Sequence, residues 1–192
     1  QIITDQKRKL HLPASFCSIW KKKDISLCDL LEGLKERGTT VPVLFRFRDL
    51  LRSRIAELND SFRKAIKEAD YQGKYQGVYP IKVNQQRQVV EEIAEFGTKY
   101  DYGLEAGSKP ELIAAMAHMH NPNAYLICNG YKDDEFIDLA LTAQKMGLNI
   151  FIVLEMPSEL DVILERARRM DIRPNLGVRI KLAAKGSGLW QE

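Results

Sequence analysis

The sequence predicts an α/β fold that is part of a (β/α)8 barrel. Short apolar segments rich in β-forming residues alternate with amphipathic segments at a period of about 25 residues. The first of these strand candidates carries a lysine near its end, and no glycine-rich turn follows it. Strands and helices that alternate at this spacing predict right-handed βαβ units and a parallel sheet.

The chain begins with a mixed region before this repeat. We expect a short strand within residues 10–20, an amphipathic helix within residues 26–38 and a strand over residues 39–47. A longer helix is predicted from Asp49, as its N-cap, to about Ala69, because apolar residues recur there every three or four positions.

The repeating part begins at Gly77. Strands are expected to begin near residues 77, 100, 124, 149 and 175. Helices are expected between them, over residues 86–96, 108–119, 133–146 and 157–170.

Two architectures fit this repeat, a doubly wound open sheet and a barrel whose last three units are missing from the chain. A nucleotide-binding doubly wound sheet carries a glycine-rich turn after its first strand, whereas this strand ends in KVNQQR. A barrel places reactive side chains at the carboxyl ends of its strands, where Lys82 lies. Pro80 argues mildly against a central strand, because it cannot donate a ladder hydrogen bond. The barrel is the favoured prediction.

Lys82 is the first candidate for chemistry. Strict alternation along the strand places Val78, Pro80 and Lys82 on one face, which we expect to line the barrel mouth. Desolvation there favours the neutral amine that Schiff-base chemistry requires. The alternative is a structural lysine whose charged end reaches solvent, and the residues alone leave both interpretations open.

Polar side chains also mark the ends of later strands. Glu105 ends the second strand, Asn129 and Lys132 follow the third, and Arg179 lies in the fifth. Because the carboxyl ends of barrel strands share one face, we expect Lys82, Glu105, Asn129 and Arg179 to form a polar ring.

Other polar residues have structural explanations. Ser108 and Glu111 match a capping box, with the serine as N-cap. The run LEMPSELD is interpreted as a strand followed by a helix start. His118 and His120 are two positions apart, so they would point to different faces of a helix and do not form a metal pair.

Composition excludes several classes of protein. The net charge is +3 over 192 residues, with acids and bases interleaved, which gives no reason to expect nucleic-acid binding. No apolar run reaches the roughly 18 residues of a membrane span, and the N-terminus lacks a signal-peptide core. Three cysteines at irregular spacing suggest free thiols. We therefore expect a soluble, cytoplasmic protein, and the ends of the chain indicate a piece of a longer one.

Four motifs together resemble the biosynthetic arginine decarboxylases, within the alanine racemase-like group of enzymes that use pyridoxal phosphate. They are YQGVYPIKVNQQ, GLEAGSKPEL, LICNGYKD and GVRIKLAAKGSG, in the same order and at compatible spacing. The segment VPVLFRFRDLLRSRI resembles the passage from the β-domain into the barrel. The resemblance thus implies that residues 1–48 contribute to a β-domain and that residues 49–192 form about five units of an alanine racemase-like barrel.

The resemblance also implies roles for single residues. Lys82 would hold pyridoxal phosphate covalently, and Glu105 and Arg179 would lie beside the cofactor. Glu111 would lie near the same mouth, where Asn129 is also expected. A histidine that stacks on the cofactor, its phosphate site and a partner subunit's contributions would come from later parts of the protein. Magnesium is implied by the family only.

The implied reaction is decarboxylation of L-arginine to agmatine and CO2, in putrescine and spermidine biosynthesis, by a homo-oligomer with shared active sites. This chain alone is expected to bind the cofactor weakly and to be inactive. A related decarboxylase of ornithine, lysine, diaminopimelate or carboxynorspermidine remains an alternative. So does a non-catalytic carrier or regulator that binds pyridoxal phosphate.

Overall fold

The chain consists of two compact units, residues 1–75 and residues 76–192. The computed structural model describes residues 3–4, 10–12 and 25–180. The predictions for residues 13–20, Cys17 included, lie outside these ranges.

The first unit contains a small antiparallel sheet and two helices. The sheet has the order β1 (Ile3–Thr4), β2 (Leu10–Leu12) and β3 (Ile25–Ser26). Helix α1 (Leu27–Glu36) begins where the Ser26 side chain accepts a hydrogen bond from the Asp29 backbone N–H at 3.2 Å. Helix α2 (Arg48–Glu68) follows. The helix predicted within residues 26–38 is confirmed.

Two details of this unit differ from the prediction. Residues 39–47 are irregular where a strand was expected, and a cis peptide bond joins Val41 to Pro42. β-forming residues make a strand only where they find a pairing partner, and Pro42 has no N–H to donate. The N-cap of α2 is Phe47, so Asp49 lies in the first turn, where its charge still favours the helix dipole.

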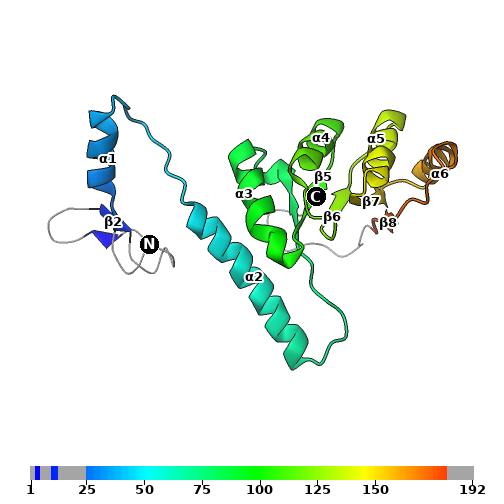
Figure 1. Cartoon of the computed structure of the whole chain (residues 1–192), viewed down its shortest axis with the longest axis horizontal. Coiled ribbons are helices and arrows are strands. Elements are labelled where there is room, and N and C mark those ends of the chain that lie inside the picture. The colour runs from blue at the N-terminus through cyan, green and yellow to red at the C-terminus, as the bar shows by residue number, and fades with distance from the viewer. Residues whose placement is uncertain (1–2, 5–9, 13–24, 181–192) are drawn as a thin grey trace. The chain divides into compact units, whose positions relative to one another are not determined.

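The described part of the second unit, residues 76–180, is a five-stranded parallel sheet with four α-helices (Figure 1). The strands are β4 (Val78–Pro80), β5 (Gly103–Ala106), β6 (Tyr125–Cys128), β7 (Asn149–Leu154) and β8 (Leu176–Val178). The helices are α3 (Arg87–Gly97), α4 (Lys109–His118), α5 (Asp134–Lys145) and α6 (Glu159–Arg169). Short 3-10 turns, η2 (Ile81–Val83) and η3 (Thr98–Tyr100), precede and follow α3. Each predicted strand and helix of this region has a counterpart, although β4 ends at Pro80 and the expected continuation of that strand is the turn η2.

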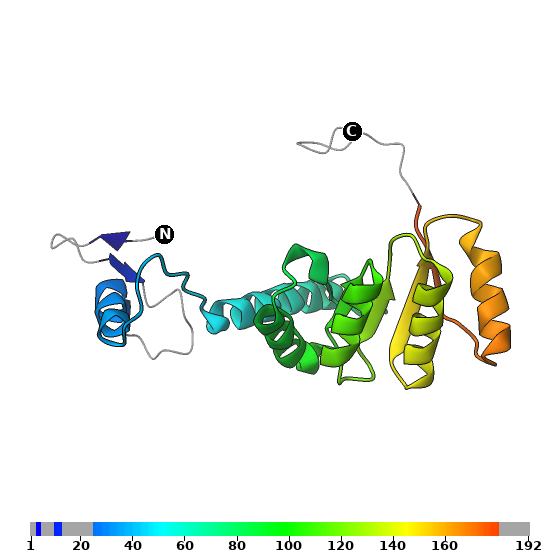
Figure 2. The same cartoon turned by 90° about the horizontal axis from the view of Figure 1, so that it is seen from above.

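The order of the strands decides between the two architectures. They pair in chain order, β4-β5-β6-β7-β8, without the reversal that creates the switch point of a doubly wound sheet. Helices α3 to α6 lie side by side along one face of the sheet (Figure 2). The second unit is therefore part of a barrel, as predicted.

The core lies between the sheet and these helices. Four strand residues point toward the helices and are fully buried, namely Leu104, Leu126, Ile150 and Ile152. Four helix residues pack against them and are equally buried, namely Leu112, Ile137, Leu141 and Ile163. Each such side chain contributes about 1.5–3 kcal/mol of hydrophobic free energy. This packing fixes the strand ends from which the candidate site is built.

Candidate active site at the strand ends

The carboxyl ends of the five strands surround a cavity of about 360 Å³. This volume lies within the range of about 300–1,000 Å³ that is usual for small-molecule sites. The cavity is lined by Lys82, Glu105, Gly107, Glu111, Asn129, Gly130, Glu155 and Arg179. All five residues that the sequence analysis selected for the site are among them.

Lys82 lies in the 3-10 turn η2, directly after β4. The strand ends at Pro80, and Ile81, the first residue of the turn, is 1% exposed, on the buried side where alternation would also place it. The Lys82 side chain is 65% exposed, and its Nζ lies 3.6 Å from Glu105 Oε1. The strand that was expected to include Lys82 thus ends two residues before it, and among the described residues its side chain is not shielded from solvent, although it does line the cavity. Its amine is accessible, and an accessible amine can add to a carbonyl group.

Glu105 faces the cavity because of its place in β5. Its neighbours Leu104 and Ala106 are fully buried against the helices, so alternation turns the Glu105 side chain to the opposite face. That side chain is 20% exposed. The register also brings Glu105 opposite Pro80, two residues before Lys82.

Glu111 departs from the predicted capping box. The Ser108 hydroxyl accepts a hydrogen bond from the Glu111 backbone N–H at 3.4 Å, as a capping serine does. The Glu111 carboxylate, however, accepts hydrogen bonds from the Gly107 backbone N–H at 2.8 Å and from Gln85 Nε2 at 2.9 Å. Because it binds residues outside the helix, Glu111 joins the loops that follow β4 and β5.

Asn129 and Gly130 form the turn after β6. The Asn129 backbone N–H donates to the Ala106 carbonyl at 2.9 Å, which extends the pairing of the strands by one residue. Gly130 has a φ of +80°, and a Cβ atom there would lie 2.6 Å from the Gly107 carbonyl oxygen. Only glycine fits this close approach.

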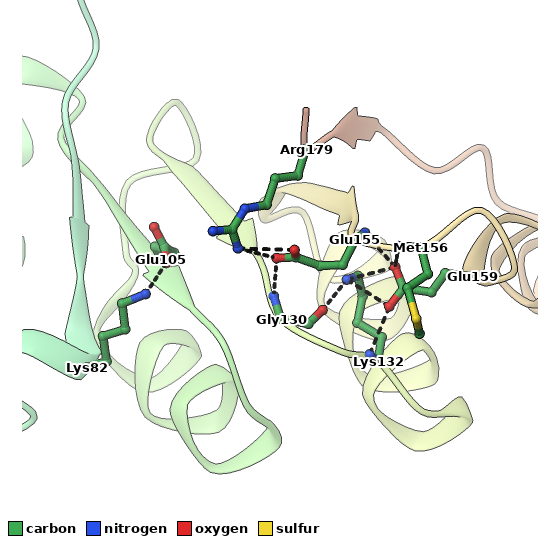
Figure 3. Close-up of polar contacts among 8 residues, drawn as sticks. All are labelled: Lys82, Glu105, Gly130, Lys132, Glu155, Met156, Glu159 and Arg179. Carbon is green, nitrogen blue, oxygen red and sulfur yellow. Dashed lines mark hydrogen bonds and ion pairs between the residues drawn. The ribbon is translucent and has the colours of Figure 1, made fainter. Parts of the chain in front are cut away.

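Arg179 follows β8, and its partner is a residue that the sequence analysis missed. Its Nη1 atom lies 3.0 Å from Glu155 Oε1 and 3.1 Å from Oε2 (Figure 3). Glu155 also accepts a hydrogen bond from the Gly130 backbone N–H at 3.0 Å. Burial raises the pKa of Glu155, but these hydrogen bonds and the charges of Arg179 and Lys132 lower it by more, so the net effect is a pKa below the usual carboxyl value.

Lys132 and Glu159 form a second pair behind the cavity. Their side chains are 0% and 3% exposed, and Lys132 Nζ lies 3.2 Å from Glu159 Oε2. The sequence analysis assigned Lys132 to a turn and gave Glu159 no role. Burial raises the pKa of Glu159, but hydrogen bonds from the Glu155 and Lys132 backbone N–H groups and from Lys132 Nζ give a net lowering.

Cys128 ends β6 but does not line the cavity. Burial raises the pKa of the Cys128 thiol to about 12, so this group stays neutral at physiological pH. Within the described ranges, no three histidine, cysteine or carboxylate side chains gather closely enough to hold a metal ion. None of the helices in those ranges is long and apolar enough to cross a membrane.

Comparison with known proteins shows the relationships of the chain. Residues 53–190 match the family model described as "Pyridoxal-dependent decarboxylase, pyridoxal binding domain". A biosynthetic arginine decarboxylase of Gloeobacter violaceus is 53% identical over 167 residues, which are 87% of this chain and 26% of that protein. The chain thus spans about a quarter of the length of this relative.

Two solved structures share the fold. The biosynthetic arginine decarboxylase of Campylobacter jejuni superimposes with a TM-score of 0.82 at 34% identity, over 95% of this chain and 30% of that one. A diaminopimelate decarboxylase of M. jannaschi superimposes with a TM-score of 0.65 over 86% of this chain and 36% of that one. Its identity of 20% supports the shared fold alone.

Proposed function

Because the chain belongs to the pyridoxal-dependent decarboxylase family, we propose that it is part of an enzyme that converts L-arginine to agmatine and CO2. The proposal concerns a protein of the relatives' full length, since the chain spans about a quarter of that length. One observation carries the chemistry: the accessible Lys82 amine lies 3.6 Å from Glu105 at the mouth of the cavity. The substrate comes from the names of the relatives.

The residues around the cavity fit the aldehyde end of pyridoxal phosphate. Lys82 supplies the amine that would hold this aldehyde, and the cation of Arg179 suits an anionic group of the cofactor or substrate. When bound, pyridoxal phosphate takes up the electron pair that is left by the departing CO2.

The chain's own residues orient the reactants and hold protons. Glu105 keeps a carboxylate beside Lys82 Nζ, so the amine would have a partner for its proton whenever it is not bound to the cofactor. Glu111 is held by Gly107 and Gln85 on the same side of the cavity. In this proposal Glu111 and Asn129 shape the mouth, and neither takes part in bond breaking.

The test is CO2 release by the full-length protein with pyridoxal phosphate, on arginine, ornithine, lysine and diaminopimelate. We expect release from arginine, and a loss of at least about 10³-fold in Lys82→Ala, which removes the attachment point. Lys64→Ala is the matched control, because Lys64 is also exposed and lies 3.7 Å from Glu68. It should leave the rate unchanged.

Other outcomes would change the proposal. Release from ornithine, lysine or diaminopimelate alone would keep the chemistry and replace the substrate. Full activity in Lys82→Ala would contradict the proposed role of Lys82. Binding of pyridoxal phosphate without CO2 release from any of the four would favour a carrier or regulator.

The remaining parts of the proposal rest on the family resemblance. They are a role in polyamine biosynthesis, a cytoplasmic location, a homo-oligomer with shared active sites, and a β-domain to which residues 1–48 contribute before the barrel of residues 49–192. Sedimentation of the full-length protein tests the oligomer. Dialysis against a chelator, followed by the CO2 assay, tests whether magnesium is required.

A further inference from the structure

Three charged side chains near the cavity have no part in the proposed chemistry. They are Lys132, Glu155 and Glu159, from the loops that follow β6 and β7 and from the first turn of α6. Together with Gly130 and Arg179 they form one continuous set of polar contacts (Figure 3).

The Lys132–Glu159 pair joins the loop that follows β6 to the loop that follows β7. Glu159 Oε2 accepts hydrogen bonds from the Glu155 and Met156 backbone N–H groups at 2.8 and 3.4 Å. Glu159 Oε1 accepts one from the Lys132 backbone N–H at 3.1 Å, while Lys132 Nζ donates to the Gly130 carbonyl. Neither residue lines the cavity. A buried ion pair with this many backbone contacts fixes the geometry of both loops.

Glu155 connects these loops to the cavity, because its backbone N–H is bound by Glu159 and its side chain lines the cavity. Its side chain is 12% exposed, whereas the Arg179 side chain that it holds is 67% exposed. A long, exposed side chain samples many rotamers unless a partner restricts it. Contacts from both carboxylate oxygens to Arg179 Nη1 restrict this one.

We propose that Glu155 is a positioning residue that holds the Arg179 guanidinium over the cavity, and that the buried Lys132–Glu159 pair fixes the loop carrying Glu155. The inference rests on the proposed function, in which the cavity takes pyridoxal phosphate. An anionic group that enters the cavity then meets a cation already in place, with less side-chain entropy to lose.

The first test is a double-mutant cycle on the affinity of the full-length protein for pyridoxal phosphate, followed by absorbance. Glu155→Gln and Arg179→Gln should each raise Kd about tenfold, and the double variant should be no weaker than either single variant. Exposed Glu165 and Arg169 pair on α6 and provide the matched control cycle. Substitutions there should leave Kd unchanged. Effects of Glu155→Gln and Arg179→Gln that multiply would overturn the inference.

The second test needs no cofactor. Hydrogen exchange of the cofactor-free, full-length protein should speed up at the Gly130 and Lys132 amides in Glu159→Gln, because the loop loses its charged partner. Glu165→Gln should show no change there. If Glu159→Gln does not fold, Glu155→Gln should speed exchange at Gly130, whose N–H it binds. Unchanged exchange at Gly130 would contradict the positioning role.

The two tests separate this inference from the proposed function. If the unaltered protein binds no pyridoxal phosphate, the proposed function fails, and the exchange measurement alone decides whether the three residues position the loop. If it binds the cofactor and releases CO2 while the cycle is additive, the function stands and the inference fails.

Discussion

Two cation–carboxylate pairs lie at the same edge of the sheet, and solvent reaches them very differently. Lys82 and Glu105, after β4 and in β5, are 65% and 20% exposed and lie 3.6 Å apart. Lys132 and Glu159, beside β6 and β7, are 0% and 3% exposed, with backbone hydrogen bonds on both carboxylate oxygens. The comparison indicates that one half of this edge is held rigidly by buried charge, while the other half leaves an amine free to react.

Breaking the buried pair should have the largest effect on stability. In Glu159→Ala, Lys132 remains charged without its partner in a site that excludes water, so we expect a loss of about 3–5 kcal/mol in the free energy of unfolding. Urea denaturation of the full-length protein measures this for the barrel transition. Glu165→Ala, on the exposed face of the same helix, should change it by less than about 0.5 kcal/mol. Equal losses in the two variants would show that the buried pair stabilises the fold no more than an exposed residue does.

Gly130→Ala should have the next largest effect. An added Cβ would lie 2.6 Å from the Gly107 carbonyl oxygen, in a backbone conformation with φ of +80°. We expect a loss of about 1–3 kcal/mol. Gly147→Ala is the control, because Gly147 also has positive φ but has no atom within 4 Å of an added Cβ. A smaller loss at Gly130 than at Gly147 would contradict the close contact between the two loops.

Acid should weaken the buried half of the edge. The pKa values of Glu155 and Glu159 are lowered in the folded protein, so their contribution is full above the usual carboxyl value of 4.5 and is lost as pH falls through the folded values. The thermal midpoint of the unaltered protein should therefore fall more steeply below pH 4.5 than that of Glu159→Gln. Parallel curves would show that Glu159 contributes no pH dependence.

Lys82→Ala should have the smallest effect on stability. An exposed pair contributes about 0–1 kcal/mol, so the free energy of unfolding should change by no more than that, although the same variant should lose activity. Denaturation of the cofactor-free protein measures this without the stabilisation that a bound ligand adds. A loss above about 2 kcal/mol would show that Lys82 stabilises the fold, and would contradict the proposed difference in stabilisation between Lys82 and Lys132.

Most of the second unit was predictable because periodicity and strand-end position are local signals. The alternation from residue 77 predicted the five strands and the four α-helices of its described part. The rule that reactive groups gather at the carboxyl ends of strands selected Lys82, Glu105, Asn129 and Arg179, which do line one cavity, whereas Glu111 came from the family resemblance. Lys82 shows where such signals end. The strand stops at Pro80, and Lys82 lies in the 3-10 turn that follows, with a side chain that is 65% exposed.

Glu155 and Glu159 show what was missed and how it could be found. Glu155 follows β7 directly, so the strand-end rule that selected Glu105 could have selected it as well. Glu159 lies in the first turn of α6, where an acidic residue has a general structural explanation. Its pairing with Lys132 joins residues 27 positions apart, and no local pattern specifies that contact. The expected strand over residues 39–47 failed for a similar reason, since strands depend on distant partners.

The agreement between strand order and chain order also affects how the barrel is made during translation. Each of β5 to β8 pairs with the strand before it, so no pairing in the described sheet has to wait for a strand that is made later than its own neighbour. A ribosome adding about 5–20 residues per second produces a unit of about 25 residues in roughly 1–5 s. This time far exceeds the microsecond or less in which a helix of this length forms. Each new strand can therefore join an edge that is already in place, and the loops that carry Gly130 and Glu155 can close in the order in which they leave the ribosome.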